Sequence, residues 1–113
     1  SSRFRMLRPV RNLPSNARIL VEFQLKILSG GLRCEIIDPR RNVLLARRDF
    51  YPGDEPATGT TSSTGGDVKL AGLFFRSSEE QEVLIILSNY TRQGEPTSLF
   101  VDDLRVLESR SPE

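Results

Sequence analysis

The chain has 113 residues, with 16 basic against 15 acidic side chains, one cysteine and no histidine. This length suits one domain with a core of its own, and a formal net charge of +1 provides no general attraction to nucleic acid or anionic membranes. The absence of histidine excludes Ser-His and Cys-His catalytic pairs and His-based zinc sites, and a single cysteine excludes an intramolecular disulfide.

Residues 1–11 form an Arg-rich arm, which contains Arg3, Arg5, Arg8 and Arg11. Elsewhere the arginines are scattered and interleaved with acids, whereas a nucleic-acid groove needs clustered basic residues with aromatic residues among them. We therefore do not expect a nucleic-acid partner. The sequence contains no run of about 18 apolar residues, so we do not expect membrane insertion within this chain.

The clearest pattern lies at residues 17–28, ARILVEFQLKIL, where apolar and polar residues alternate. A period of two predicts a long strand with one face in the core, and the inward residues are Ile19, Val21, Phe23, Leu25 and Ile27. Residues 29–31, SGG, can form a tight turn, so we expect a hairpin with the next strand, LRCEII. Alternation there places Cys34 inward, as a small buried hydrophobe rather than a reactive thiol.

The following segments alternate short apolar runs with turn residues. Residues 38–42, DPRRN, predict a second turn because Asp and Pro favour its first positions, and VLLARRDF follows as a strand. Residues 51–67 are rich in Gly, Pro, Ser and Thr, which predicts a long flexible loop, and loops of this length are often functional. The segments VKLAGLFFR, EVLIILSNY and SLFVDDLRVLE complete the predicted strands. Because no segment shows helical spacing with caps, we predict an antiparallel β-sandwich over residues 1–113, excised from a longer protein.

The order of these elements and the closing LFVDDLRVLE resemble the galactose-binding-like jelly-roll superfamily. The resemblance covers residues 17–108, and its most specific part is an apolar or aromatic pair followed by two acids and alternating apolar residues. It implies an all-β jelly-roll sandwich of the kind found in carbohydrate-binding modules and in accessory domains of bacterial cell-envelope proteins. It also implies an extracytoplasmic location, in the periplasm or at the cell surface.

Two adjacent carboxylates, Asp102 and Asp103, lie in the closing strand among apolar neighbours. In the family such a pair commonly binds a structural calcium or caps loop amides, so the resemblance implies Asp102 and Asp103 as metal ligands. The arm lacks the further acid that such a calcium site needs, so a salt bridge to Arg5, Arg8 or Arg105, or amide capping, explains Asp102 better. No other cofactor is expected. A regular strand directs the two carboxylates to opposite faces, which argues against glycosidase chemistry, and we expect no enzymatic activity.

Carbohydrate binding by a non-catalytic accessory domain is the function that the resemblance implies. The candidate ligand-binding residues lie at strand ends and connectors, and they are Tyr51, Tyr90, Arg47, Asp54 and Arg92. Tyrosine rings stack on the apolar faces of sugar rings, and the charged residues offer polar contacts to hydroxyl groups.

The alternative is a structural or protein-interaction sandwich that packs against a neighbouring protein domain and binds no small molecule. The chain has no tryptophan and two tyrosines, which is a poor supply for sugar stacking. A packing domain would present a flat apolar patch, for which Leu20, Leu28 and Leu44 are candidates. A sugar binder would instead present a groove that contains Tyr51 or Tyr90.

Overall fold

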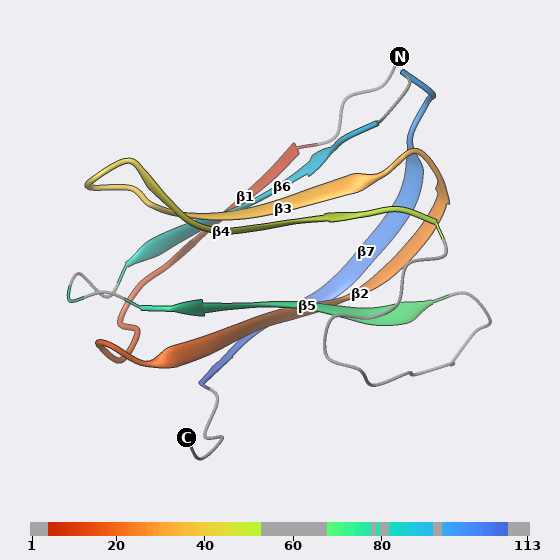
Figure 1. Cartoon of the computed structure of the whole chain (residues 1–113). Coiled ribbons are helices and arrows are strands. Elements are labelled where there is room, and N and C mark those ends of the chain that lie inside the picture. Colours follow the sequence, from red (N-terminus) through yellow and green to blue (C-terminus); the bar gives the residue numbers. More distant parts are fainter. Residues whose placement is uncertain (1–4, 53–67, 78, 80–81, 92–93, 109–113) are drawn as a thin grey trace.

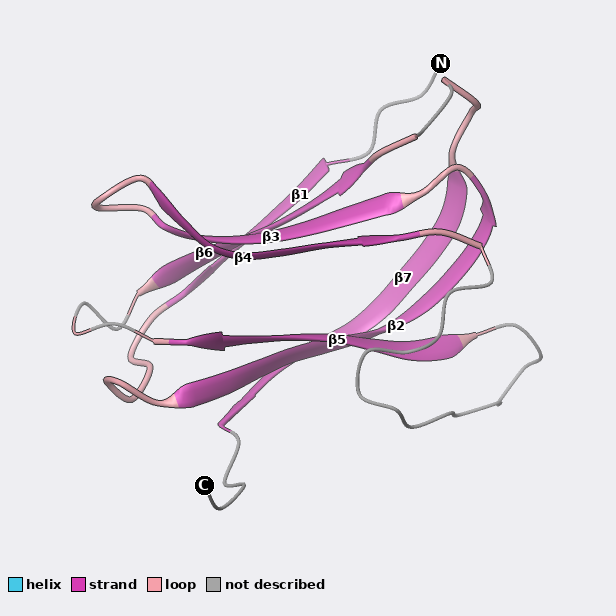
Figure 2. Ribbon diagram, in the orientation of Figure 1, coloured by secondary structure: helices cyan, strands magenta, loops and turns pink. Residues whose placement is uncertain are grey.

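A computed structural model describes residues 5–52, 68–77, 79, 82–91 and 94–108. Most of the predicted loop 51–67 and the two candidate residues Asp54 and Arg92 lie outside these described residues. The described chain folds into strands, which are β1 (Arg5–Val10), β2 (Arg18–Ser29), β3 (Leu32–Asp38), β4 (Val43–Phe50), β5 (Lys69–Arg76), β6 (Val83–Asn89) and β7 (Ser98–Glu108) (Figures 1 and 2).

The strands form two antiparallel sheets that lie one above the other (Figure 1). One sheet has the strand order β1-β6-β3-β4, and the other has the order β5-β2-β7. The predicted all-β, sandwich-like architecture is therefore confirmed. Within the described ranges there is no helix with the length and apolar character that crossing a membrane requires.

The core lies between the sheets and follows the alternation of β2. Val21 and Phe23 are fully buried, and Ile19 is 1% exposed. The ring of Phe23 meets the ring of Phe50 edge-on, with 5.7 Å between centroids, and so joins β2 of one sheet to β4 of the other. Cys34 is also fully buried, and this burial raises the pKa of its thiol to about 12, as expected for a packing residue.

The predicted hairpin between residues 17–28 and LRCEII is wrong. β2 pairs with β5 and β7, whereas β3 pairs with β4 and β6. Residues 29–31 therefore carry the chain from one sheet to the other, with Gly30 at a φ of 75°. A glycine turn reverses the chain in both cases, and the sequence around it does not specify whether the two strands pair or face each other across a core.

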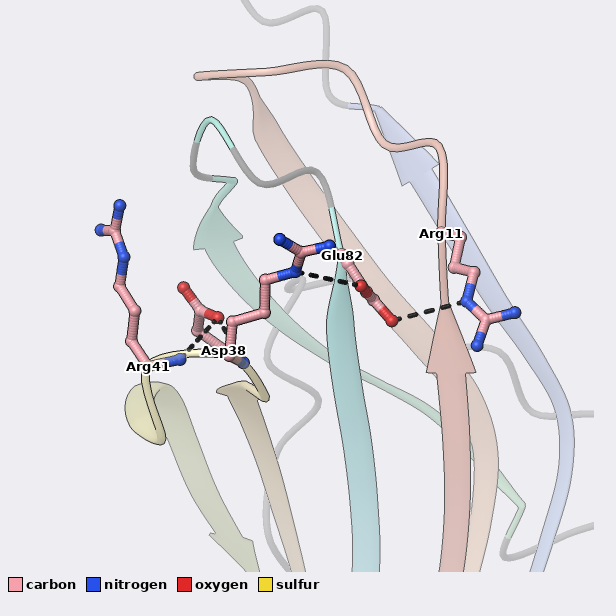
Figure 3. A network of polar contacts seen from close by, with 5 residues as sticks. Arg11, Asp38, Arg41 and Glu82 are labelled. Carbon is pink, nitrogen blue, oxygen red and sulfur yellow. Dashed lines mark hydrogen bonds and ion pairs between the residues drawn. The ribbon is translucent and has the colours of Figure 1, made fainter.

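The predicted turn at residues 38–42 is confirmed, since it connects the paired strands β3 and β4. Asp38 is 2% exposed, and its Oδ1 accepts hydrogen bonds from the backbone N–H groups of Arg40 and Arg41, at 3.0 and 3.3 Å. Figure 3 shows this turn beside Glu82, whose carboxylate lies 3.4 Å from Arg11 Nε and 3.9 Å from Arg40 Nε. The charges therefore connect the turn to the ends of β1 and β6.

Residues 5–10 of the Arg-rich arm belong to the four-stranded sheet. Residues 5–10 form the edge strand β1, which pairs with β6 from Arg5 opposite Ser88 to Val10 opposite Val83. Met6 and Val10 pack against the core. The apolar residues of Arg5–Val10 are few and are interrupted by arginines, so their alternation is too weak to predict a strand.

Candidate functional site

Tyr51 and Tyr90 are neighbours, although 39 positions separate them in the sequence. Each follows the end of a strand, β4 and β6 respectively, on the outer face of the four-stranded sheet. Their ring centroids are 6.4 Å apart, and the ring planes are tilted by 58°. Both residues are partly exposed. The structure thus brings together the two aromatic residues that the sequence analysis selected.

Arg33 lies beside this pair and was not predicted. It points outward from β3 because its neighbours Leu32 and Cys34 are fully buried on the inner face. Its guanidinium carbon lies 3.8 Å from the centroid of the Tyr90 ring, so cation and ring are stacked. The alternation of LRCEII already places Arg33 outward, but only the pairing of three strands shows what it contacts.

Asp49 holds this guanidinium in place. It lies directly opposite Arg33 in the pairing of β3 with β4. Arg33 Nε donates to Asp49 Oδ1 at 2.8 Å, and the NH2 group donates to Oδ2 at 2.9 Å, in the two-bond arrangement that fixes a guanidinium. We call Tyr51, Tyr90, Arg33 and Asp49 the tyrosine site.

The charges of the tyrosine site are stable around neutral pH. The hydrogen bonds from Arg33 lower the pKa of Asp49, and the same bonds raise the pKa of Arg33. Neither group changes its protonation near pH 7. The four residues can therefore stack on a ligand, donate and accept hydrogen bonds, and do so from fixed positions.

Gly31 allows the segments of the tyrosine site to approach each other. A Cβ atom at this position would lie 2.5 Å from the carbonyl oxygen of Tyr90, 2.9 Å from that of Phe50 and 2.9 Å from the Tyr51 ring. The backbone N–H of Tyr90 donates to the carbonyl oxygen of Gly31 at 2.9 Å. A side chain at residue 31 would therefore force apart the segments that carry Tyr51 and Tyr90.

Arg47, another predicted residue, lies next to the tyrosine site. It is exposed, and it projects from the same face of β4 as Asp49, two residues before it. Its positive charge contributes to the lowered pKa of Asp49. Arg47 therefore adds a cation at the border of the site.

The acidic pair in β7 does not sit in a regular buried strand. Both Asp102 and Asp103 are exposed, and Asp103 adopts a left-handed φ of 59°. The register with β2 shifts here, since Glu22 faces Arg105 while Gln24 faces Asp102. This β-bulge overturns the prediction that the two carboxylates alternate between opposite faces.

The bulge also shows how the two carboxylates are compensated. Asp102 Oδ1 accepts a hydrogen bond from the backbone N–H of Asp103 at 2.9 Å, which is the predicted amide capping. The predicted partner Arg105 pairs with Asp103 instead of Asp102, at 2.9 Å, and lowers the pKa of that carboxylate. The other proposed partners, Arg5 and Arg8, lie in the opposite sheet.

The contact of Asp103 with Arg105 bears on the predicted calcium site at Asp102 and Asp103. The Arg105 guanidinium occupies one carboxylate oxygen of Asp103, and its charge would repel a cation there. In the described part of the chain, no three carboxylate or thiolate groups gather where they could hold a metal. Calcium binding stays a prediction, which a titration of the unfolding midpoint with calcium tests.

The three leucines proposed as an apolar patch do not form one. Leu20 and Leu28 belong to β2 in the three-stranded sheet, whereas Leu44 belongs to β4 in the four-stranded sheet. Leu28 and Leu44 are 64% and 47% exposed, but on opposite sides of the sandwich. Sequence alternation shows that a residue points outward, and the sheet to which it belongs depends on strand pairing.

A scan against protein-family models and a search of curated protein sequences found no match to this chain.

Proposed function

We propose that this chain is a non-catalytic carbohydrate-binding accessory domain with a galactose-binding-like jelly-roll topology, belonging to an extracytoplasmic cell-envelope or secreted protein. The observation that carries this proposal is the packing of Tyr51 against Tyr90 on an outer sheet face, beside the Arg33–Asp49 ion pair. Two aromatic residues from distant segments meet where a strand ends, which is a common position for ligand contacts.

The chemistry of the tyrosine site matches a sugar ring. The apolar C–H face of a pyranose stacks on aromatic rings, and its hydroxyl groups both donate and accept hydrogen bonds. The tyrosines offer rings with phenolic hydroxyls, while Arg33 donates and Asp49 accepts. Because the ion pair already fixes Arg33 over Tyr90, little side-chain entropy is lost when a ligand binds.

Tyrosine fluorescence provides a direct test, because the chain contains two tyrosines and no tryptophan. Titration with a panel of oligosaccharides should change the emission of Tyr51 and Tyr90 in a saturable manner. Tyr90→Ala should weaken binding about tenfold, measured by calorimetry. Phe100→Ala is the matched control, since Phe100 is 48% exposed on the other sheet and should leave binding unchanged. If no glycan of the panel changes the fluorescence or the heat signal, sugar binding at the tyrosine site is rejected.

A second candidate function, packing against a neighbouring protein domain, is favoured by a different part of the same sheet face. Residues that face one another across the strands form an apolar strip there, which comprises Leu7, Pro9, Ile37, Leu44 and Leu84. Leu7 is 51% exposed, and Ile86, although it faces outward, is only 8% exposed because its neighbours cover it. The outer face of a sheet that meets only water is normally polar.

Sedimentation of the isolated domain tests the apolar strip. An uncovered strip should produce weak self-association that rises with concentration, and Leu44→Glu should reduce it. Leu28→Glu is the matched control, because Leu28 is exposed on the opposite sheet. A strictly monomeric wild-type domain at high concentration would count against a packing role for this surface.

A further inference from the structure

A hollow of about 200 Å³ lies on the outer face of the three-stranded sheet, on the opposite side of the sandwich from the tyrosine site. Its walls come from all three strands, with Glu22 and Gln24 from β2, Lys69 and Leu70 from β5, and Asp103 and Arg105 from β7. We call it the polar hollow.

Two local features explain why this sheet face is hollowed. Gly72 lies opposite Glu22 in the pairing of β5 with β2, so one position of the outer face has no side chain. On the other side of Glu22, the β-bulge inserts Asp103 at a φ of 59° and displaces β7 from regular pairing. Bulges of this kind redirect side chains, and here Asp103 turns toward the hollow.

The residues that line the polar hollow include charges of both signs. Glu22 and Asp103 carry two negative charges, and Lys69 and Arg105 carry two positive charges. The ion pair between Arg105 and Asp103 keeps both groups charged, and Gln24 adds an amide that both donates and accepts. Because groups of both signs and an amide line the hollow, no single charge dominates it, and the mixture of donors and acceptors suits a neutral molecule with several hydroxyl groups.

The geometry points to the polar hollow as a second carbohydrate subsite, which takes one neutral sugar residue. The choice of ligand class rests on the proposed function of the tyrosine site. The volume is below the roughly 300–1,000 Å³ of pockets for drug-sized ligands, so a single ring fits better than an oligosaccharide. Leu70 provides an apolar wall for one face of the ring, while the charged and amide groups contact its hydroxyls.

The positions of the two sites imply a functional consequence. Because they lie on opposite outer faces of the sandwich, one glycan segment cannot occupy both at once without passing around the domain. Each site can instead engage a separate chain or branch. The domain would then be bivalent, and its avidity for a polysaccharide surface would exceed the affinity of either site.

The test is a nuclear magnetic resonance titration of the labelled domain with the methyl glycosides of glucose, galactose, mannose and N-acetylglucosamine, followed in parallel by tyrosine fluorescence. We expect saturable shifts of the backbone amides of Gln24, Leu70 and Arg105 that are retained in Tyr90→Ala. Gln24→Ala should weaken these shifts about tenfold. Lys26→Ala is the matched control, because Lys26 is the next outward residue of β2 beyond the hollow.

The possible outcomes separate this inference from the proposed function. Shifts confined to the surroundings of Tyr51 and Tyr90, with a change in fluorescence, would support the proposed function and overturn the second subsite. Shifts at the hollow that do not saturate, or that survive Gln24→Ala, would also overturn it. Tighter binding of glucuronate or glucosamine than of the neutral sugars would contradict the inference of a neutral ligand. No response by either method would reject both sites.

Discussion

The two outer faces of the sandwich each carry an arginine–aspartate pair of nearly the same length. On the four-stranded sheet, Arg33 and Asp49 form two bonds of 2.8 and 2.9 Å between neighbouring strands, with side chains 22% and 25% exposed. On the three-stranded sheet, Arg105 and Asp103 form one bond of 2.9 Å within a single strand, with side chains 57% and 45% exposed. Distance alone therefore does not tell which pair matters. The contribution of each pair to stability depends on the number of hydrogen bonds, on the burial of the side chains and on whether the pair connects two strands.

Removing the Arg33 side chain should have the largest effect on stability. Arg33→Ala deletes both bonds to Asp49 and the stacking on Tyr90, and it leaves a half-buried carboxylate without its partner. We expect a loss of about 2 kcal/mol in the free energy of unfolding, measured by urea denaturation. Arg47→Ala, on the exposed outer face of the adjacent strand, should cost far less. Equal losses for the two variants would mean that the ion pair contributes nothing specific.

The backbone at the β-bulge offers a second comparison. Asp103→Val places a β-branched residue at a left-handed φ, which is strained for such side chains, so the unfolding midpoint should fall by about 5 °C. Asp103→Gly removes the same ion pair but adopts this conformation without strain. If valine and glycine had the same effect, the bulge geometry would not be the cause.

The pH dependence of stability should distinguish the two faces further. Because Arg33 lowers the pKa of Asp49 in the folded state, this pair stabilises the protein fully above the unfolded-state pKa of about 3.9. The contribution disappears as the pH falls through the lower, folded-state pKa. Wild type should therefore be more stable than Asp49→Asn by about 1 kcal/mol at pH 7, and this difference should shrink as the pH falls below about 3.9. A difference that persists unchanged at pH 2 would contradict this linkage.

The smallest effect on stability is expected for the exposed Arg105–Asp103 pair. Arg105→Ala should leave the unfolding midpoint unchanged within error, because the side chains of Arg105 and Asp103 are well hydrated and connect only positions of one strand. Its consequence should appear in sugar binding to the polar hollow instead. A clear fall in the midpoint would show that the bulge depends on this pair.

Much of the fold was predictable from alternation and turn chemistry. The inward face of β2, the burial of Cys34 and the turn at residues 38–42 all follow from local patterns that the structure confirms. Local patterns are reliable here because each is satisfied by a few adjacent residues. Local patterns gave a wrong prediction at residues 29–31, where the glycine turn connects the two sheets instead of closing a hairpin. They also gave a wrong prediction at Asp103, where a β-bulge replaces the regular alternation of faces.

Alternation along the chain specified which residues point into the core, because the side chains on one face of a strand recur at every second position. The sequence also placed Tyr51 and Tyr90 at strand ends. The pairing of strands brings these tyrosines together, places Arg33 over the Tyr90 ring and places Asp49, rather than another acid, beside Arg33. Contacts across strands depend on which strands pair and in what register, and the packing of all the apolar faces together sets this register rather than any single segment.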